Sequence, residues 1–88
     1  MVDPEQARQL REYIEREIIR RPGARIENDT PLVSSGLIDS LALVDILGKL
    51  EDVTQRRIPA GKVQAKDMDT VELMFATAER VGRPRGAR

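Results

Sequence analysis

Residues 35–47, "SGLIDSLALVDIL", decide how this chain folds, because a helical apolar pattern begins inside them. An acid and a hydroxyl, Asp39 and Ser40, interrupt the aliphatic run at that point. Aspartate is a favourable N-cap residue, since its side chain accepts hydrogen bonds from unpaired N–H groups of the first helical turn. We therefore expect a helix from about Ser40 to Thr54.

The expected helix has two apolar faces. The residues of the first face recur at helical spacing and should pack on the core. They are Leu43, Ile46, Leu50 and Val53. The second face, with Ser40 and Glu51, also holds Val44 and part of Leu47. A helix buried on one side needs polar residues there, so the pattern predicts an exposed apolar surface beside Ser40.

The chain before this stretch predicts a first helix. Asp3 is a suitable N-cap, Pro4 suits the first helical position, and Gln6 is placed for a capping box. The apolar spacing continues towards residues 20–23, "RRPG", where Gly23 can take the left-handed conformation that ends a helix.

Residues 22–39 then form a long loop, and loops of this length in small domains are often functional. Within the loop, "NDTPL" predicts one helical turn with Thr30 as its cap and Pro31 at its first position. Three further residues are too apolar for a solvated loop and should pin it to the core. They are Leu32, Leu37 and Ile38.

The region after the second helix predicts one short and one long helix. Residues 56–68, "RRIPAGKVQAKDM", have no clear period, and we expect a short helix or turn there. Its apolar anchors are Ile58, Val63 and Met68. The last helix should begin at Asp69, with Glu72 completing a capping box, and should stop at Gly82.

The fold class is therefore all-α, a small four-helix bundle with three main helices and one short one. A long loop separates the first two helices. A chain of 88 residues has room for one domain. We assign residues 1–82 to that domain and residues 83–88, "RPRGAR", to a disordered basic tail.

The composition excludes many functions. Without cysteine there is no thiolate nucleophile and no sulfur-ligated metal, and without histidine the commonest general base is missing. We therefore expect neither an enzyme nor a metal site. No apolar run approaches the roughly 20 residues of a membrane span, and the N-terminus has no signal-peptide apolar region. These features predict a cytoplasmic protein without a membrane span.

The charge balance is zero overall but uneven along the chain. Residues 28–78 carry eight acids against five bases, whereas residues 79–88 carry four arginines and one glutamate. The chain has twelve arginines, which raises the question of nucleic-acid binding. Arginines on the first helix are mixed with acids, and no aromatic platform exists for single strands. We therefore expect no nucleic-acid partner.

Ser40 is the candidate for chemistry. It lies at the first turn of a helix, where unpaired N–H groups and the positive end of the helix dipole favour an anion such as a phosphate ester. The plain alternative is that Asp39 and Ser40 are only a cap pair. A cap, however, requires neither a long apolar loop with Gly36 before it nor an apolar exposed face after it.

Residues 36–41, "GLIDSL", follow Asp29 and Leu32 in the loop and precede the amphipathic helix. In this frame the sequence resembles the acyl carrier proteins and the related peptidyl and aminoacyl carriers. The resemblance covers about residues 5–81 and includes the start of the final helix at Thr70.

The resemblance implies a cofactor and a set of partners. A phosphopantetheinyl transferase, with magnesium on the transferase, would move 4′-phosphopantetheine from coenzyme A to Ser40. The thiol of this arm would then hold an acyl or aminoacyl group as a thioester. An acyl- or aminoacyl-activating ligase would load it and downstream transferases would unload it. Asp39 matches the acid before the modified serine and would help the transferase dock. We expect a monomer.

Six further positions resemble those at which carriers meet partner enzymes. They are Leu41, Val44, Asp45, Gly48, Glu51 and Asp52. The two apolar residues would contact partners, the acids would meet basic patches, and the glycine would let a partner backbone approach. Alternatively, the two apolar residues belong to the core, the acids are only solvated surface residues, and the glycine is merely tolerated in the helix.

The chain also departs from carriers of bulk fatty-acid synthesis. It is not strongly acidic, and Ala42 stands where those carriers commonly have an acid. It looks more like discrete D-alanyl, aminoacyl or specialised acyl carriers of lipid or secondary-metabolite biosynthesis. The other hypothesis is an unmodified helical interaction module that binds a partner through Ser40, Leu41 and Val44.

Overall fold

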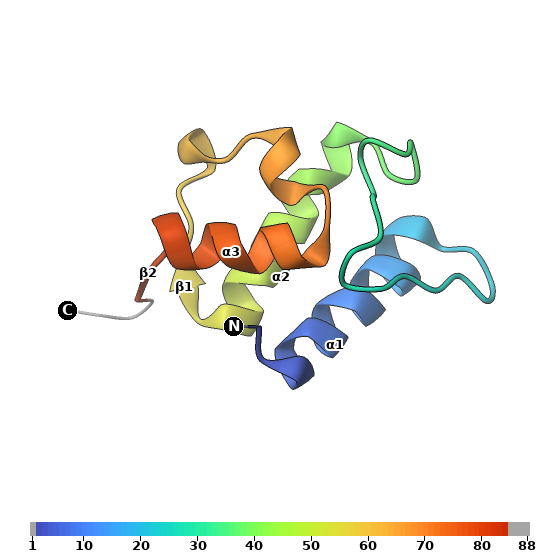
Figure 1. The fold of residues 1–88 in the computed structure, drawn as a ribbon, viewed down its shortest axis with the longest axis horizontal. Coiled ribbons are helices and arrows are strands. Elements are labelled where there is room, and N and C mark those ends of the chain that lie inside the picture. The colour runs from blue at the N-terminus through green and yellow to red at the C-terminus, as the bar shows by residue number, and fades with distance from the viewer. Residues whose placement is uncertain (1, 85–88) are drawn as a thin grey trace.

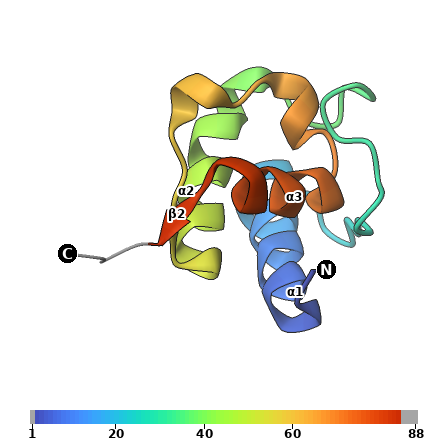
Figure 2. The same cartoon turned by 60° about the vertical axis from the view of Figure 1, so that its left-hand side comes forward.

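The structure, a computed structural model, describes residues 2–84 and consists mainly of three α-helices (Figure 1). The elements are α1 (Pro4–Tyr13), η1 (Ile14–Ile19), η2 (Ser40–Ala42), α2 (Leu43–Thr54), β1 (Arg56–Arg57), η3 (Ala60–Lys62), η4 (Ala65–Met68), α3 (Val71–Val81) and β2 (Arg83–Pro84). Figure 2 shows α1 and α2 side by side in opposite directions, with α3 crossing them. The all-α prediction is confirmed.

The core lies between the three helices and is aliphatic apart from one phenylalanine. Its members are Ala7, Leu10, Ile14, Ile26, Leu32, Ile38, Ile46, Leu50, Ile58, Met68, Val71, Met74, Phe75 and Ala78. The predicted stripe of α2 faces this core, with Ile46 and Leu50 fully buried and Leu43 and Val53 packed at its edge. The apolar period of the sequence therefore identified the buried face of the helix.

The first helix begins as predicted but ends differently. The Asp3 carboxylate accepts hydrogen bonds from the N–H groups of Glu5 (2.8 Å) and Gln6 (3.3 Å). The helix continues as the π-helical turn η1, and Arg20 ends it in the left-handed conformation, with φ of 60°. Gly23 is also left-handed, with φ of 76°, but it belongs to the turn that follows.

The last helix is capped by Thr70, so the predicted cap at Asp69 is wrong. The Thr70 hydroxyl oxygen accepts a hydrogen bond from the N–H of Leu73, 3.0 Å away. With Thr70 as the cap, Glu72 no longer stands at the third helical position that a capping box requires. The physical reason is that the Asp69 carboxylate is already engaged by the loop of residues 32–34.

The segment between α2 and α3 contains two 3₁₀ turns, η3 and η4, in place of one short helix. The three predicted anchors behave as expected, because Ile58 and Met68 are buried and Val63 packs against the core. A reciprocal pair of hydrogen bonds between Gln64 and Asp67 begins η4. Two residues, Asp69 and Thr70, separate the end of η4 from the start of α3.

The long loop is tied to the core as predicted. Leu32 and Ile38 are buried, and Leu37 packs against the core. The predicted helical turn after Thr30 is wrong. The Thr30 hydroxyl oxygen accepts a hydrogen bond from the N–H of Glu27, at 2.7 Å. Thr30 therefore closes the turn that precedes it.

The predicted tail is only partly described. Arg83 and Pro84 are extended and pair antiparallel with Arg57 and Arg56. Residues 85–88 lie outside the described residues, and the boundary at residue 82 stays a prediction. Within residues 2–84, no helix has the length and apolar character that crossing a membrane requires.

Candidate functional site

Ser40 is exposed at the first position of a helix that runs without a break from residue 40 to residue 54. In Figure 1 the long loop meets the upper end of α2 at η2, the turn that begins with Ser40. The Asp39 carboxylate accepts a hydrogen bond from the N–H of Ala42 at 3.1 Å, which confirms the predicted cap. The dipole of α2 places its positive end beside the Ser40 hydroxyl.

The chain has three serines, and their hydroxyls differ in what they bind. The Ser34 hydroxyl donates to Asp69 at 2.8 Å, and the Ser35 hydroxyl donates to the carbonyl of Pro31 at 2.6 Å. Within residues 2–84, the Ser40 hydroxyl makes no hydrogen bond. Ser40 is thus the serine whose oxygen is both exposed and uncommitted.

An exposed apolar surface adjoins Ser40, as the sequence predicted. Among the described residues, three large hydrophobic side chains are exposed: Leu41 (82%), Val44 (76%) and Leu73 (43%). The first two follow Ser40 by one and four residues, so they lie around the same helix end. Because most of each side chain is exposed, core packing is excluded as the role of Leu41 and Val44.

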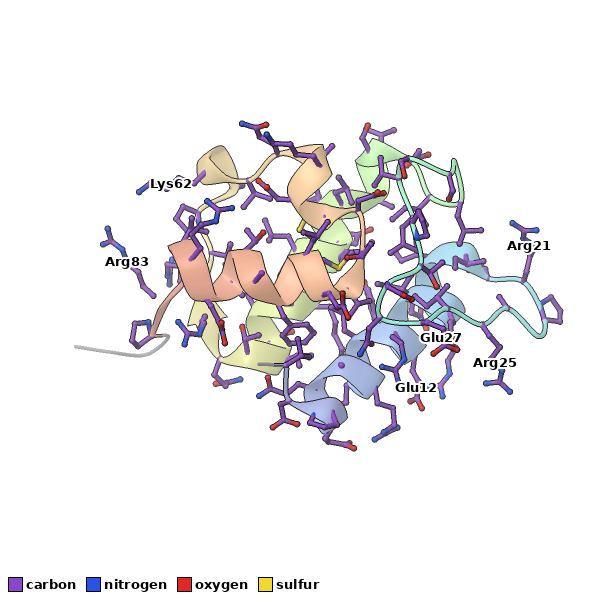
Figure 3. The ribbon with its side chains drawn as sticks, in the orientation of Figure 1. Glu12, Arg21, Arg25, Glu27, Lys62 and Arg83 are labelled. Atoms are coloured by element: carbon purple, nitrogen blue, oxygen red, sulfur yellow. The ribbon has the colours of Figure 1, made fainter. Side chains whose placement is uncertain are left out.

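Val44 also lines a small, mostly apolar cavity of about 150 Å³ between α2 and the two 3₁₀ turns. The other lining residues are Leu43, Leu47, Ala60, Val63, Gln64, Ala65 and Met68. A larger hollow of about 520 Å³ lies at the turn after η1 and is lined mainly by arginines and glutamates. Figure 3 shows Arg21 and Arg25 of that turn pointing outwards. This larger hollow is lined by none of the predicted site residues, so we place the candidate site at Ser40.

The remaining partner-surface residues separate into two groups. Asp45 and Gly48 are exposed, and a Cβ added at Gly48 would meet nothing within 4 Å, so no close contact inside the domain requires glycine. Asp52 is exposed as well. Glu51 differs, because its half-buried carboxylate accepts a hydrogen bond from the N–H of Ile58 at 2.8 Å. The structure therefore gives Glu51 a role inside the domain.

Asp69 is the residue that sequence reasoning missed. Its carboxylate accepts hydrogen bonds from the loop that leads to Ser40, and these bonds hold the pKa of Asp69 below its ordinary value of 3.8, those of Ser34 most strongly. The sequence did contain a signal for this role of Asp69, which is the threonine that follows it. Thr70 can cap the last helix by itself, which leaves Asp69 free for another donor.

The candidate site is an exposed serine with an uncommitted hydroxyl, at the start of a helix of a small helical domain. Comparison with protein-family models matches residues 8–74 to the phosphopantetheine attachment site family. The chain belongs to this family of carrier proteins, and 4′-phosphopantetheine is the prosthetic group that its members carry. No significant match is found among curated proteins or among solved structures.

Proposed function

We propose that Ser40 is the residue to which 4′-phosphopantetheine is attached. The observation that carries this proposal is the exposed Ser40 hydroxyl, which has no partner among the described residues, whereas Ser34 and Ser35 are engaged. A phosphodiester on Ser40 would lie at the positive end of the α2 dipole, where a negative charge is stabilised. The arm would extend into solvent, because the side chains of Asp39 and Leu41 on either side are exposed too.

In the attachment reaction this chain is a substrate. The Ser40 oxygen forms a bond to the phosphorus of coenzyme A that carries pantetheine. The bond from that phosphorus to adenosine 3′,5′-bisphosphate breaks, and the bisphosphate leaves with the electron pair. A base on the transferase takes the Ser40 proton. The attached arm supplies a thiol that the chain itself lacks, since the sequence has no cysteine.

The loaded protein would carry an acyl or aminoacyl thioester between a ligase and downstream transferases, without catalysing a step itself. Leu41 and Val44 are the proposed partner contacts, because both are exposed and both adjoin Ser40. Asp45 adds negative charge to this surface and should raise the association rate with basic partners. Glu51 contributes less to this surface, since its carboxylate is held by Ile58.

The test is phosphopantetheinylation in vitro. The protein is incubated with coenzyme A, magnesium and a promiscuous phosphopantetheinyl transferase, and its intact mass is measured. We expect the wild-type chain to gain one arm. Ser34→Ala and Ser35→Ala are matched controls and should gain one arm each. Ser40→Ala should gain none. Modification of Ser40→Ala, or an unmodified wild type beside a fully modified control carrier, would contradict the proposal.

A further inference from the structure

Three successive backbone N–H groups converge on one oxygen of Asp69. The N–H groups of Leu32 (3.2 Å), Val33 (2.8 Å) and Ser34 (2.8 Å) donate to Oδ1. The Ser34 hydroxyl donates to Oδ2 at 2.8 Å. Consecutive N–H groups of this kind form a concave site for an anion, and here the anion is a side chain of the same protein. The start of α3 thereby binds the long loop.

This anchored stretch is connected to Ser40 by one further backbone bond. The carbonyl of Leu32 accepts a hydrogen bond from the N–H of Ile38 at 3.1 Å, and both side chains are buried. Ile38 is followed by the cap residue Asp39 and then by Ser40. The position of the loop around Leu32 therefore sets the direction from which the chain enters α2.

The carboxylate matters because it is what ties the N–H groups of Val33 and Ser34 to the rest of the domain. Leu32 is also held by its buried side chain and by its N–H, which donates to the Asp69 carbonyl at 2.8 Å. Residues 33–36 form turns without a helix or strand, and Ser34, Ser35 and Gly36 are exposed. Buried or half-buried N–H groups need an acceptor, and Asp69 is the acceptor they have. The earlier half of the loop is held separately, since the Asn28 carbonyl accepts from the N–H of Glu72 at 3.0 Å.

We propose that Asp69 is a positioning residue for the modification of Ser40. Its carboxylate holds residues 32–38 in the conformation that presents Ser40 to the transferase. This inference rests on the proposed function of Ser40. Asp69 itself touches neither the reacting oxygen nor, in this proposal, the transferase. Its effect is on the fraction of molecules whose loop is correctly placed, and a reduced competent fraction weakens apparent binding in proportion.

The experiment measures steady-state kinetics of phosphopantetheine transfer with the unmodified protein as the varied substrate. Asp69→Ala removes the four side-chain bonds, while the bond from the Leu32 N–H to the Asp69 carbonyl stays. It should raise KM about 10-fold with kcat unchanged, because fewer molecules are competent to bind. Asp69→Asn keeps one acceptor oxygen in place, so its KM should lie closer to that of wild type than to that of Asp69→Ala. Ser34→Ala removes only the hydroxyl bond and should raise KM roughly twofold.

Thr70→Ala is the matched control. It removes the cap of α3 one residue from Asp69 and destabilises the domain, but it leaves every bond to residues 32–34 intact. Its KM should stay at the wild-type value. Amide hydrogen exchange gives a second readout without the transferase: residues 32–34 and 38 should exchange faster in Asp69→Ala and not in Thr70→Ala.

The outcomes separate this inference from the proposed function. Equal KM values for Asp69→Ala and Thr70→Ala, with the wild type fully modified, would overturn the role of Asp69 and leave Ser40 as the attachment site. If Asp69→Ala does not fold, a KM of Ser34→Ala equal to that of wild type would overturn it equally. An unmodified wild type would remove both proposals.

Discussion

The substitution Leu50→Ala tests whether α2 is held by the core that lies behind the Ser40 surface. Leu50 is fully buried, and the change removes three carbon atoms. At about 0.8 kcal/mol for each buried CH₂ group, the lost transfer free energy is about 2.4 kcal/mol. The cavity that remains adds to this, so the total should fall at about 2–5 kcal/mol.

That loss is large for this domain. At about 0.05–0.15 kcal/mol per residue, a domain of 88 residues has roughly 4–13 kcal/mol of unfolding free energy. A domain of this size loses about 4–8 °C in Tm for each kcal/mol. We therefore expect the Tm of Leu50→Ala to fall by at least about 10 °C.

Urea and thermal unfolding followed by circular dichroism measure this difference. The matched control is Leu41→Ala on the same helix, where the side chain is 82% exposed. It should change the unfolding free energy by less than about 0.5 kcal/mol. If Leu50→Ala unfolds within that margin of wild type, or if Leu41→Ala loses as much as Leu50→Ala, our assignment of the buried and exposed faces of α2 is wrong.

Two further predictions concern glycine and pH. Gly48→Ala should stabilise the domain by roughly 0.5–1 kcal/mol, because a Cβ there meets nothing within 4 Å and alanine favours a helix interior. Gly36→Ala should destabilise it by about 1 kcal/mol, because φ at Gly36 is 80°, a conformation that favours glycine. Urea unfolding measures both changes, and the same sign for both would contradict the reasoning. The pKa of Asp69 is lowered by the loop bonds, so its stabilisation is complete above the ordinary value of 3.8 and is lost as the pH falls through the lowered value. The difference in unfolding free energy between wild type and Asp69→Asn should therefore be constant near neutral pH and shrink below about pH 4, and a difference that grows on acidification would refute this role.

The helices that carry the site were readable from local patterns. The cap at Asp39, the buried stripe through Leu50 and the exposed face at Val44 depend on residues within a few positions of one another. Such short-range signals keep their meaning when the chain folds, because a helix brings residues three and four positions apart to the same face. The prediction of Ser40 as the candidate site used only these local features and the "GLIDSL" motif.

The predictions that failed involve side chains that had more than one available partner. Asp69 and Thr70 can both cap a helix, and Thr30 can close a turn on either side. The partner contact predicted for Glu51 stays a prediction, although its carboxylate accepts a hydrogen bond from the N–H of Ile58. The N–H groups that bind Asp69 come from a distant part of the chain, and the N–H that binds Thr30 precedes it instead of following it. The local pattern could not show which of the available N–H groups each side chain would bind.

The sequence by itself therefore determined the helical fold class, the start of the second helix and the exposed serine there, because periodicity and capping act within a few residues. Only the tertiary structure decided which acid binds the loop before Ser40. That choice depends on N–H groups about 36 residues away from Asp69, which come within hydrogen-bonding distance only when the three helices have packed.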